Sequence, residues 1–237
     1  MALYAIGDLH LSLGADKPMD VFGGAWEGYV DKIARGLSVL TGDDTIILCG
    51  DISWAMSLEE AYEDFAFLAS FPGRKLLVKG NHDYWWTTAA KMRRFFAEKG
   101  LEGFEILHNN AFACEGRALC GTRGWFFEED NRGTHDEKVF LRECARLEAS
   151  LRAGRALLPD DAAPGEKLLV FLHYPPLYEG YRCDGIVDLL DRYGAARCYY
   201  GHLHGAAHGR AIEGDYRGIE YTLISADYLG FQPVRIF

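Results

Sequence analysis

The sequence predicts an α/β protein in which helices cover two sheets, a layered sandwich of order α/β/β/α. Three observations favour this fold class. Short apolar runs rich in β-branched and aromatic residues alternate with amphipathic helical patterns. Segments typical of β-meanders interrupt the alternation, and no linker rich in serine, proline or glycine divides the chain. The length of 237 residues fits one large domain, residues 1–237.

The predicted strands are short, as expected for buried strands of a sheet. Five apolar runs cover residues 2–6, 45–49, 75–78, 168–172 and 197–200. Further short strands with intervening turns are expected within 104–121, 221–225 and 234–237.

Amphipathic patterns predict helices between these strands. Two of them begin with a capping box, Ser57 with Glu60 and Thr134 with Glu137. A glycine after the periodic stretch, such as Gly154, is expected to end a helix. The predicted helices cover residues 26–40, 57–71, 88–99, 134–153 and 186–193.

The composition excludes several classes of protein. Hydrophobic residues make up 49% of the chain and charged residues 25%, which is typical of a compact soluble protein. The longest apolar stretches are far shorter than the roughly 18 residues that a membrane span needs, and the first residues show no secretory signal. The six cysteines show no metal-binding or redox spacing, so we expect reduced thiols and a cytoplasmic protein.

The charge balance limits the partners. Acidic residues number 35 and basic residues 25, which gives a net charge of −10. Such a balance argues against a broad surface for nucleic acid and favours a small-molecule ligand that is held locally.

Side chains that can bind metal follow all five buried strands. Because ligands of open α/β sheets bind at the carboxyl ends of strands, these segments can converge on one site. Five of the eight histidines lie in these strand ends. The residues are Asp8 and His10, Asp51, Asn81 with His82 and Asp83, His173, and His202 with His204.

The donor types indicate which metals fit. Carboxylate oxygens, imidazole nitrogens and an amide oxygen, without thiolates, suit Mn, Fe, Zn or Ni rather than a structural zinc of the cysteine type. Seven ligands are too many for one tetrahedral ion, so two divalent ions that share a carboxylate are expected.

These motifs resemble those of the calcineurin-like metallophosphoesterases: DxH, GD, GNH followed by an acid, H, and GHxH, in this order over residues 8–204. The resemblance implies the four-layer sandwich of that family. It also implies that Asp8, His10, Asp51 and His204 hold one metal ion. Asp51, Asn81, His173 and His202 would hold the other ion, so that Asp51 bridges the two.

The implied activity is hydrolysis of a phosphomonoester or phosphodiester of a small molecule, nucleotides included. By the same resemblance, a hydroxide that bridges the metals attacks phosphorus. His82 is not a ligand and would assist at the phosphate or the leaving group, while Asp83 would fix the tautomer of His82. Two alternatives stay open: a nuclease, and a metal-bound interaction scaffold without catalysis.

Several other residues each allow two interpretations, one functional and one structural. Trp54, Trp85 and Trp86 follow metal motifs and fit either an apolar wall for a substrate or the protein core. Arg123 and Arg182 lie in glycine-flanked loops and fit either a phosphate clamp or an ordinary surface position. Loops 11–25, 121–134 and 174–185 are the expected substrate rim. The substrate, the native metal and the oligomeric state stay open.

Overall fold

The computed structural model describes residues 1–125, 134–159 and 167–237. Residue contacts divide the chain into two compact units. Unit 1 comprises Met1–Ile106 with Ile224–Phe237, and unit 2 comprises Leu107–Leu223. The assignment of the whole chain to a single domain stays a prediction. Most of the predicted rim loop 121–134 lies outside the described residues.

Unit 1 is built on a five-stranded mixed sheet of order β13-β1-β2-β3-β4. Strands β1 to β4 run parallel, and β13 pairs antiparallel with β1. In the register, Ile6 lies opposite Leu48, and Leu48 lies opposite Leu77. The strands are β1 (Leu3–Ile6), β2 (Thr45–Cys49), β3 (Arg74–Val78), β4 (Phe104–Ile106) and β13 (Val234–Arg235).

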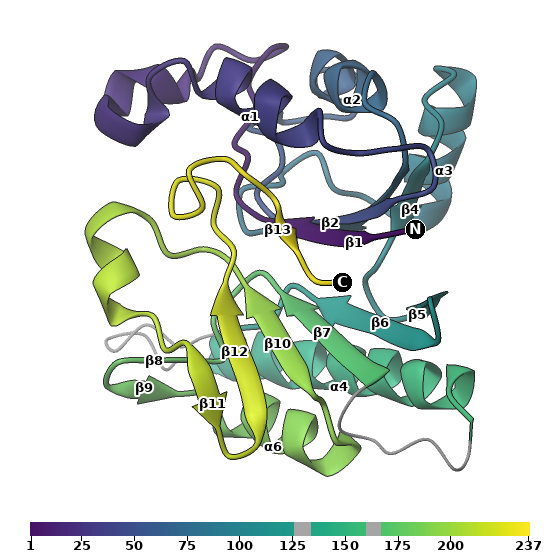
Figure 1. The fold of residues 1–237 in the computed structure, drawn as a ribbon, viewed down its shortest axis with the longest axis vertical. Coiled ribbons are helices and arrows are strands. Elements are labelled where there is room, and N and C mark those ends of the chain that lie inside the picture. The colour runs from purple at the N-terminus through teal and green to yellow at the C-terminus, as the bar shows by residue number, and fades with distance from the viewer. Residues whose placement is uncertain (126–133, 160–166) are drawn as a thin grey trace. The chain divides into compact units, whose positions relative to one another are not determined.

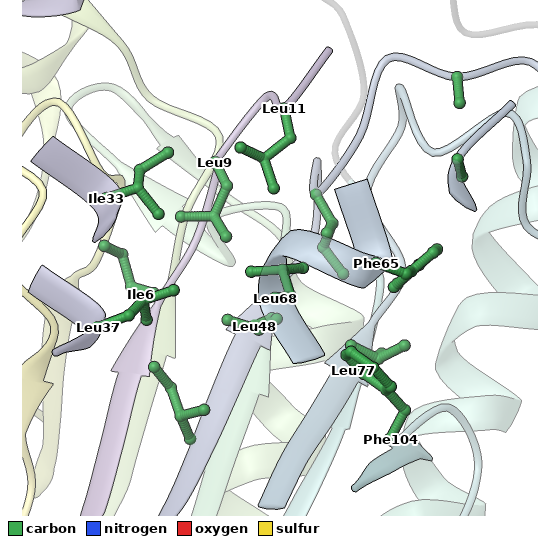
Figure 2. Close-up of a cluster of buried hydrophobic side chains, with 14 of the residues drawn as sticks. Ile6, Leu9, Leu11, Ile33, Leu37, Leu48, Phe65, Leu68, Leu77 and Phe104 are labelled. Carbon is green, nitrogen blue, oxygen red and sulfur yellow. The ribbon is translucent and has the colours of Figure 1, made fainter. Parts of the chain in front are cut away.

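Three helices cover one face of this sheet (Figure 1). They are α1 (Tyr29–Leu37), α2 (Tyr62–Ala69) and α3 (Ala89–Glu98), and two short 3-10 turns, Met19–Phe22 and Gly24–Trp26, precede α1. Figure 2 shows Ile6, Leu48 and Leu77 pointing from the strands toward α1 and α2, where they form a buried apolar cluster. This cluster fixes the strands whose carboxyl ends carry the polar motifs.

Two predicted helix starts differ from the structure. Helix α1 begins at Tyr29, because Trp26 belongs to the preceding 3-10 turn. Helix α2 begins at Tyr62, although the Ser57 hydroxyl accepts the backbone N–H of Glu60 at 3.2 Å. The capping contact therefore forms in the turn that leads into the helix.

Unit 2 is built on a six-stranded mixed sheet of order β11-β12-β10-β7-β6-β5. Its central strands β6, β7, β10 and β12 run parallel. The strands are β5 (Ala111–Cys114), β6 (Arg117–Thr122), β7 (Leu168–Leu172), β10 (Arg197–Tyr200), β11 (Gly214–Tyr216) and β12 (Ile219–Leu223). A separate hairpin joins β8 (Leu177–Tyr178) to β9 (Tyr181–Arg182), and a 3-10 helix covers Gly205–Arg210.

Two helices pack on the sheet of unit 2 (Figure 1): α4 (Thr134–Leu157) and α6 (Asp184–Tyr193). The prediction that Gly154 ends α4 was wrong, since the helix continues to Leu157. A Cβ atom at Gly154 would lie 2.2 Å from Sγ of Cys120 in β6. The glycine therefore permits a close approach of helix and strand rather than a helix end.

The predicted α/β class is confirmed, with two mixed sheets that each carry helices. Among the described residues, no helix has both the length and the apolar character that crossing a bilayer would demand.

Candidate metal centre

Three neighbouring parallel strands of unit 1 deliver the first group of predicted ligands. Asp8 and His10 follow β1, Asp51 follows β2, and Asn81 follows β3. Because the carboxyl ends of β1, β2 and β3 lie side by side, the side chains meet there. Nε2 of His10 lies 3.8 Å from Oδ2 of Asp51. Asp8, His10 and Asp51 are almost completely buried.

Backbone hydrogen bonds hold the segments after β1 and β2 together beyond the strands. The N–H of Asp8 donates to the carbonyl oxygen of Gly50 at 2.9 Å, and the N–H of His10 donates to the carbonyl oxygen of Asp51 at 2.9 Å. A bridge between Leu11 and Ser53 continues the parallel pairing. The ligand-bearing turns are thus as firmly placed as the strands themselves.

The backbone at these residues is strained. Asp8, His10 and Asp51 have φ angles of 59°, 48° and 47°, in the left-handed region that side chains other than glycine rarely adopt. His202 of unit 2 has a φ of 74°. Such conformations cost about 1–3 kcal/mol each and gather where function requires a particular side-chain direction. Four of the seven predicted ligands therefore lie in strained turns.

Gly80 provides the space that the Asp51 side chain occupies. A Cβ atom at Gly80 would lie 2.0 Å from Oδ1 and 2.1 Å from the backbone nitrogen of Asp51. No other residue type fits there without displacing the carboxylate. The backbone N–H of His82 donates to the same Oδ1 at 2.8 Å, so two residues of the segment after β3 fix the orientation of Asp51.

The carboxylate of Asp83 accepts several hydrogen bonds, while the tautomer-fixing role that we predicted for it stays a prediction. Its fully buried carboxylate accepts the backbone N–H groups of Ile52 at 2.8 Å and Gly80 at 2.7 Å, and the indole N–H of Trp85 at 3.0 Å. Burial and the negative charge of Asp51 raise the pKa of Asp83 to about 6. These contacts make Asp83 a link between the segments after β2 and β3.

The imidazole of His82 lies near the side chains of Tyr84, Trp54 and His10. Its Nδ1 lies 3.3 Å from the hydroxyl oxygen of Tyr84, and its ring centroid lies 4.5 Å from that of Trp54. Trp54 also stacks on His10 with centroids 4.8 Å apart. The half-buried indole of Trp54 thus lies against a predicted ligand and the predicted catalytic histidine.

The other tryptophans after metal motifs serve the core. Trp85 is 2% exposed and packs edge-on against Phe65, with ring centroids 4.9 Å apart. The structure therefore supports the interpretation of Trp85 as a core residue. Trp86 is partly buried and packs against the same cluster.

Asp64 supports the site, and it was not identified from the sequence. The carboxylate of Asp64, fully buried in α2, accepts the hydroxyl of Ser53 and the backbone N–H of Leu13. Burial raises the pKa of Asp64 above its ordinary value. It ties the segments after β1 and β2 to the helix layer. The amphipathic pattern holds no signal for this role, because an aspartate in the first turn of a helix usually faces solvent.

Two adjacent parallel strands of unit 2 deliver the second group of predicted ligands. His173 follows β7, and His202 and His204 follow β10. The N–H of Gly201 donates to the carbonyl oxygen of His173 at 3.1 Å, and the rings of His173 and His202 have centroids 5.1 Å apart. His173 is fully buried, whereas His202 and His204 are half-buried.

Arg182 has a local structural role. Its guanidinium donates to Asp184 at 2.6 Å and to Asp188 at 2.7 Å, both on α6. These two carboxylates engage Nη1 and Nη2, while Nε is buried without an acceptor among the described residues. Because both terminal nitrogens are engaged, the structure favours an ordinary local role for Arg182 over a phosphate clamp.

The donor chemistry of both groups fits divalent metal ions. Unit 1 contributes two carboxylates, an imidazole and an amide, and unit 2 contributes imidazoles. Oxygen and nitrogen donors of this kind bind Mn, Fe, Zn or Ni. The steric cradle at Gly80 and the strained backbone of the ligands present these donors, as a metal site requires.

The donor set fits a divalent metal site, and the family that the sequence matches implies a metal-dependent phosphohydrolase. The chain belongs to the calcineurin-like phosphoesterases, since the sequence model of this family matches residues 1–206. The family generally uses a centre of two divalent metal ions. A comparison with curated protein sequences gives no match.

Two solved structures are similar over nearly the whole chain. One is a phosphopantetheinyl hydrolase from Mycobacterium tuberculosis, with 17% identity and a TM-score of 0.54, covering 100% of this chain and 95% of that one. The other is a protein of unknown function from Aquifex aeolicus, with 15% identity and a TM-score of 0.52, covering 99% of this chain and 95% of that one. Both likenesses support the fold.

Proposed function

We propose that the protein hydrolyses a phosphoester bond of a small molecule with the help of two divalent metal ions. Asp51 would be shared between the ions. One ion would be held by Asp8, His10, Asp51 and His204, and the other by Asp51, Asn81, His173 and His202. The family match supports the reaction, and the donor types support the ligand set.

The observation that carries the proposal is the strained backbone of Asp8, His10, Asp51 and His202. Left-handed backbone at four residues of three separate motifs is unfavourable for stability, and such backbone is retained where the side-chain directions serve a purpose. Metal coordination is such a purpose, because it needs donors at fixed directions.

When bound, the two ions supply an activated water nucleophile and neutralise charge on the phosphoryl oxygens. His82 would donate a proton to the leaving-group oxygen, and its half-buried ring is accessible for this. Tyr84 and Trp54 restrict the orientation of that ring. The backbone N–H of His82 holds the Asp51 carboxylate in the direction that a shared ligand needs.

The substrate is proposed to be a small phosphomonoester or phosphodiester. A net charge of −10 disfavours the polyanionic surface of nucleic acid, which argues against a nuclease. The similar mycobacterial structure is a phosphopantetheinyl hydrolase, which adds phosphopantetheinyl esters to the compounds worth testing. The described residues, which include all six cysteines, contain no disulfide bond, which supports the proposal of a reducing, cytoplasmic environment.

The test is an assay of apo-protein to which manganese, iron, zinc or nickel is added singly. Each sample is offered p-nitrophenyl phosphate, bis-p-nitrophenyl phosphate and a phosphopantetheinyl ester. We expect metal-dependent cleavage, and the ratio between the two nitrophenyl esters separates a monoesterase from a diesterase.

Absence of cleavage with any metal, in a protein whose metal content is two per chain, would contradict the proposal and favour the non-catalytic scaffold. Cleavage of DNA in preference to all small esters, with binding that weakens steeply as salt rises, would favour the nuclease.

A further inference from the structure

Arg123 lies beside the predicted ligand His173. Strands β6 and β7 are neighbours and parallel, and Thr122 at the end of β6 lies opposite Leu172 at the end of β7. The next residues along the two strands are therefore Arg123 and His173, by the same topology that brings the ligands together.

A short chain of contacts joins Arg123 to the histidines of unit 2. The backbone N–H of Tyr174 donates to the carbonyl oxygen of Arg123 at 2.9 Å. The ring of Tyr174 lies 4.6 Å from the ring of His202 and 5.1 Å from that of His173, between centroids. The guanidinium carbon of Arg123 lies 5.9 Å from the centroid of Tyr174 and 5.1 Å from that of Trp125.

A buried carboxylate anchors the guanidinium. Nη2 of Arg123 lies 3.4 Å from Oε1 of Glu143, whose side chain is 0% exposed. Glu143 has further partners, because it also accepts Arg146 and the hydroxyl of Thr122. One carboxylate thus faces two guanidinium groups, and these three residues together carry one positive charge in excess.

Two N–H groups of this cluster are buried without an acceptor among the described residues: Nε of Arg123 and Nε1 of Trp125. Leaving a buried donor unpaired is unfavourable, because the donor loses its hydrogen bond to water and gains none in the protein. The excess positive charge and the unpaired donors of this cluster favour binding of an anionic hydrogen-bond acceptor. The Arg123 side chain keeps 17% of its surface exposed, so a ligand can approach the side chain although Nε itself is buried.

We infer that Arg123, held by Glu143 between Trp125 and Tyr174, binds a phosphoryl oxygen of the substrate next to the metal-binding histidines. This inference rests on the proposed function and adds a residue that the metal motifs do not include. In this inference, the guanidinium of Arg123 is the bidentate donor that recognises phosphate, and Glu143 positions that guanidinium.

The test compares Arg123→Met with Arg182→Met, which removes an arginine of the same unit that is engaged by Asp184 and Asp188. Arg123→Met should fold, because Glu143 keeps Arg146 and Thr122 as partners. Metal content is measured by elemental analysis. Binding of inorganic phosphate to the metal-loaded protein is measured by calorimetry, and kcat and KM are measured with phenyl phosphate.

We expect Arg123→Met to weaken phosphate binding and to raise KM by about 10- to 100-fold, the effect of losing one charged hydrogen bond. Metal content should not change, and Arg182→Met should behave as the wild type. Arg123→Lys keeps the charge but not the fork, so it should restore part of the phosphate affinity. It also serves as the test if Arg123→Met does not fold.

If phosphate affinity and KM are unchanged in Arg123→Met, the inference is overturned while the proposed function stays intact. If the methionine variant does not fold, the same result in folded Arg123→Lys overturns the inference. Loss of metal together with phosphate binding would also overturn it, because Arg123 would then support the ligands instead. A wild type that cleaves no ester, but binds phosphate in a manner dependent on Arg123, would contradict the proposed function alone.

Discussion

The backbone N–H of His82 donates to Oδ1 of Asp51 at 2.8 Å. Two functions thus meet in one residue: the main chain of His82 orients the carboxylate proposed to join two metal ions, while its side chain lies against Trp54 and Tyr84. Substitution of the side chain alone can separate these functions, since any residue other than proline keeps the N–H.

His82→Ala should lower kcat by about 10²- to 10⁴-fold, the usual contribution of a general acid or base. The metal content should stay that of the wild type, because the hydrogen bond to Asp51 is retained. Activity and elemental analysis on the same preparation check this. A His82→Ala protein without metal would show that the imidazole is itself a ligand.

Gly80→Ala should displace the Asp51 carboxylate, because the added methyl group would lie 2.0 Å from Oδ1. We expect a loss of about 1–3 kcal/mol in the free energy of unfolding, together with reduced metal content. Urea denaturation and elemental analysis measure the two effects. Gly42→Ala is the matched control, since a Cβ atom there has no heavy atom within 4 Å.

Asp83→Ala should destabilise the apo-protein by on the order of 3 kcal/mol, because buried N–H groups of Ile52, Gly80 and Trp85 lose their acceptor. Asp83→Asn keeps one acceptor oxygen and should lose less. Denaturation curves of the three proteins measure this order. A fully stable Asp83→Ala protein with impaired turnover would contradict this structural role and favour the predicted catalytic role of Asp83.

Buried thiols should resist alkylation in the folded protein. Burial raises the pKa of Cys120 to about 12 and also raises the pKa of the fully buried Cys198, so their reactive thiolate forms stay scarce as pH rises from 7 to 9. The rate of iodoacetamide labelling at these two residues, read by mass spectrometry, should therefore stay low over this range. The same residues in urea should label faster, and more so at pH 9, and equal rates in both states would contradict the burial.

The sequence predicted the strands and the ligand-bearing turns well for a physical reason. Short apolar runs such as 45–49 and 168–172 are buried on both faces, and parallel pairing then places the residues after them at one edge of each sheet. The position of His10 beside Asp51 follows from this topology alone.

The supporting residues could not be predicted, because their roles depend on contacts between distant segments. Asp64 resembles a solvent-facing helix residue, and Gly154 resembles a helix end. Trp85 follows a metal motif yet packs in the core, since the turn after Asp83 directs its indole inward. Hydrophobic periodicity predicts which face of a helix or strand is buried. It does not predict which N–H group donates a hydrogen bond to which buried carboxylate.

The central claim is that Asp51 is shared by two metal ions, and Asp51→Asn tests it most directly. Apo-protein is loaded with manganese, freed of excess metal and analysed for metal per chain, with the exposed Asp16→Asn as the control. We predict two ions per chain in the wild type and the control, and loss of both ions and of esterase activity in Asp51→Asn. An Asp51→Asn protein that retains two ions would contradict the account, and so would a wild type that binds one.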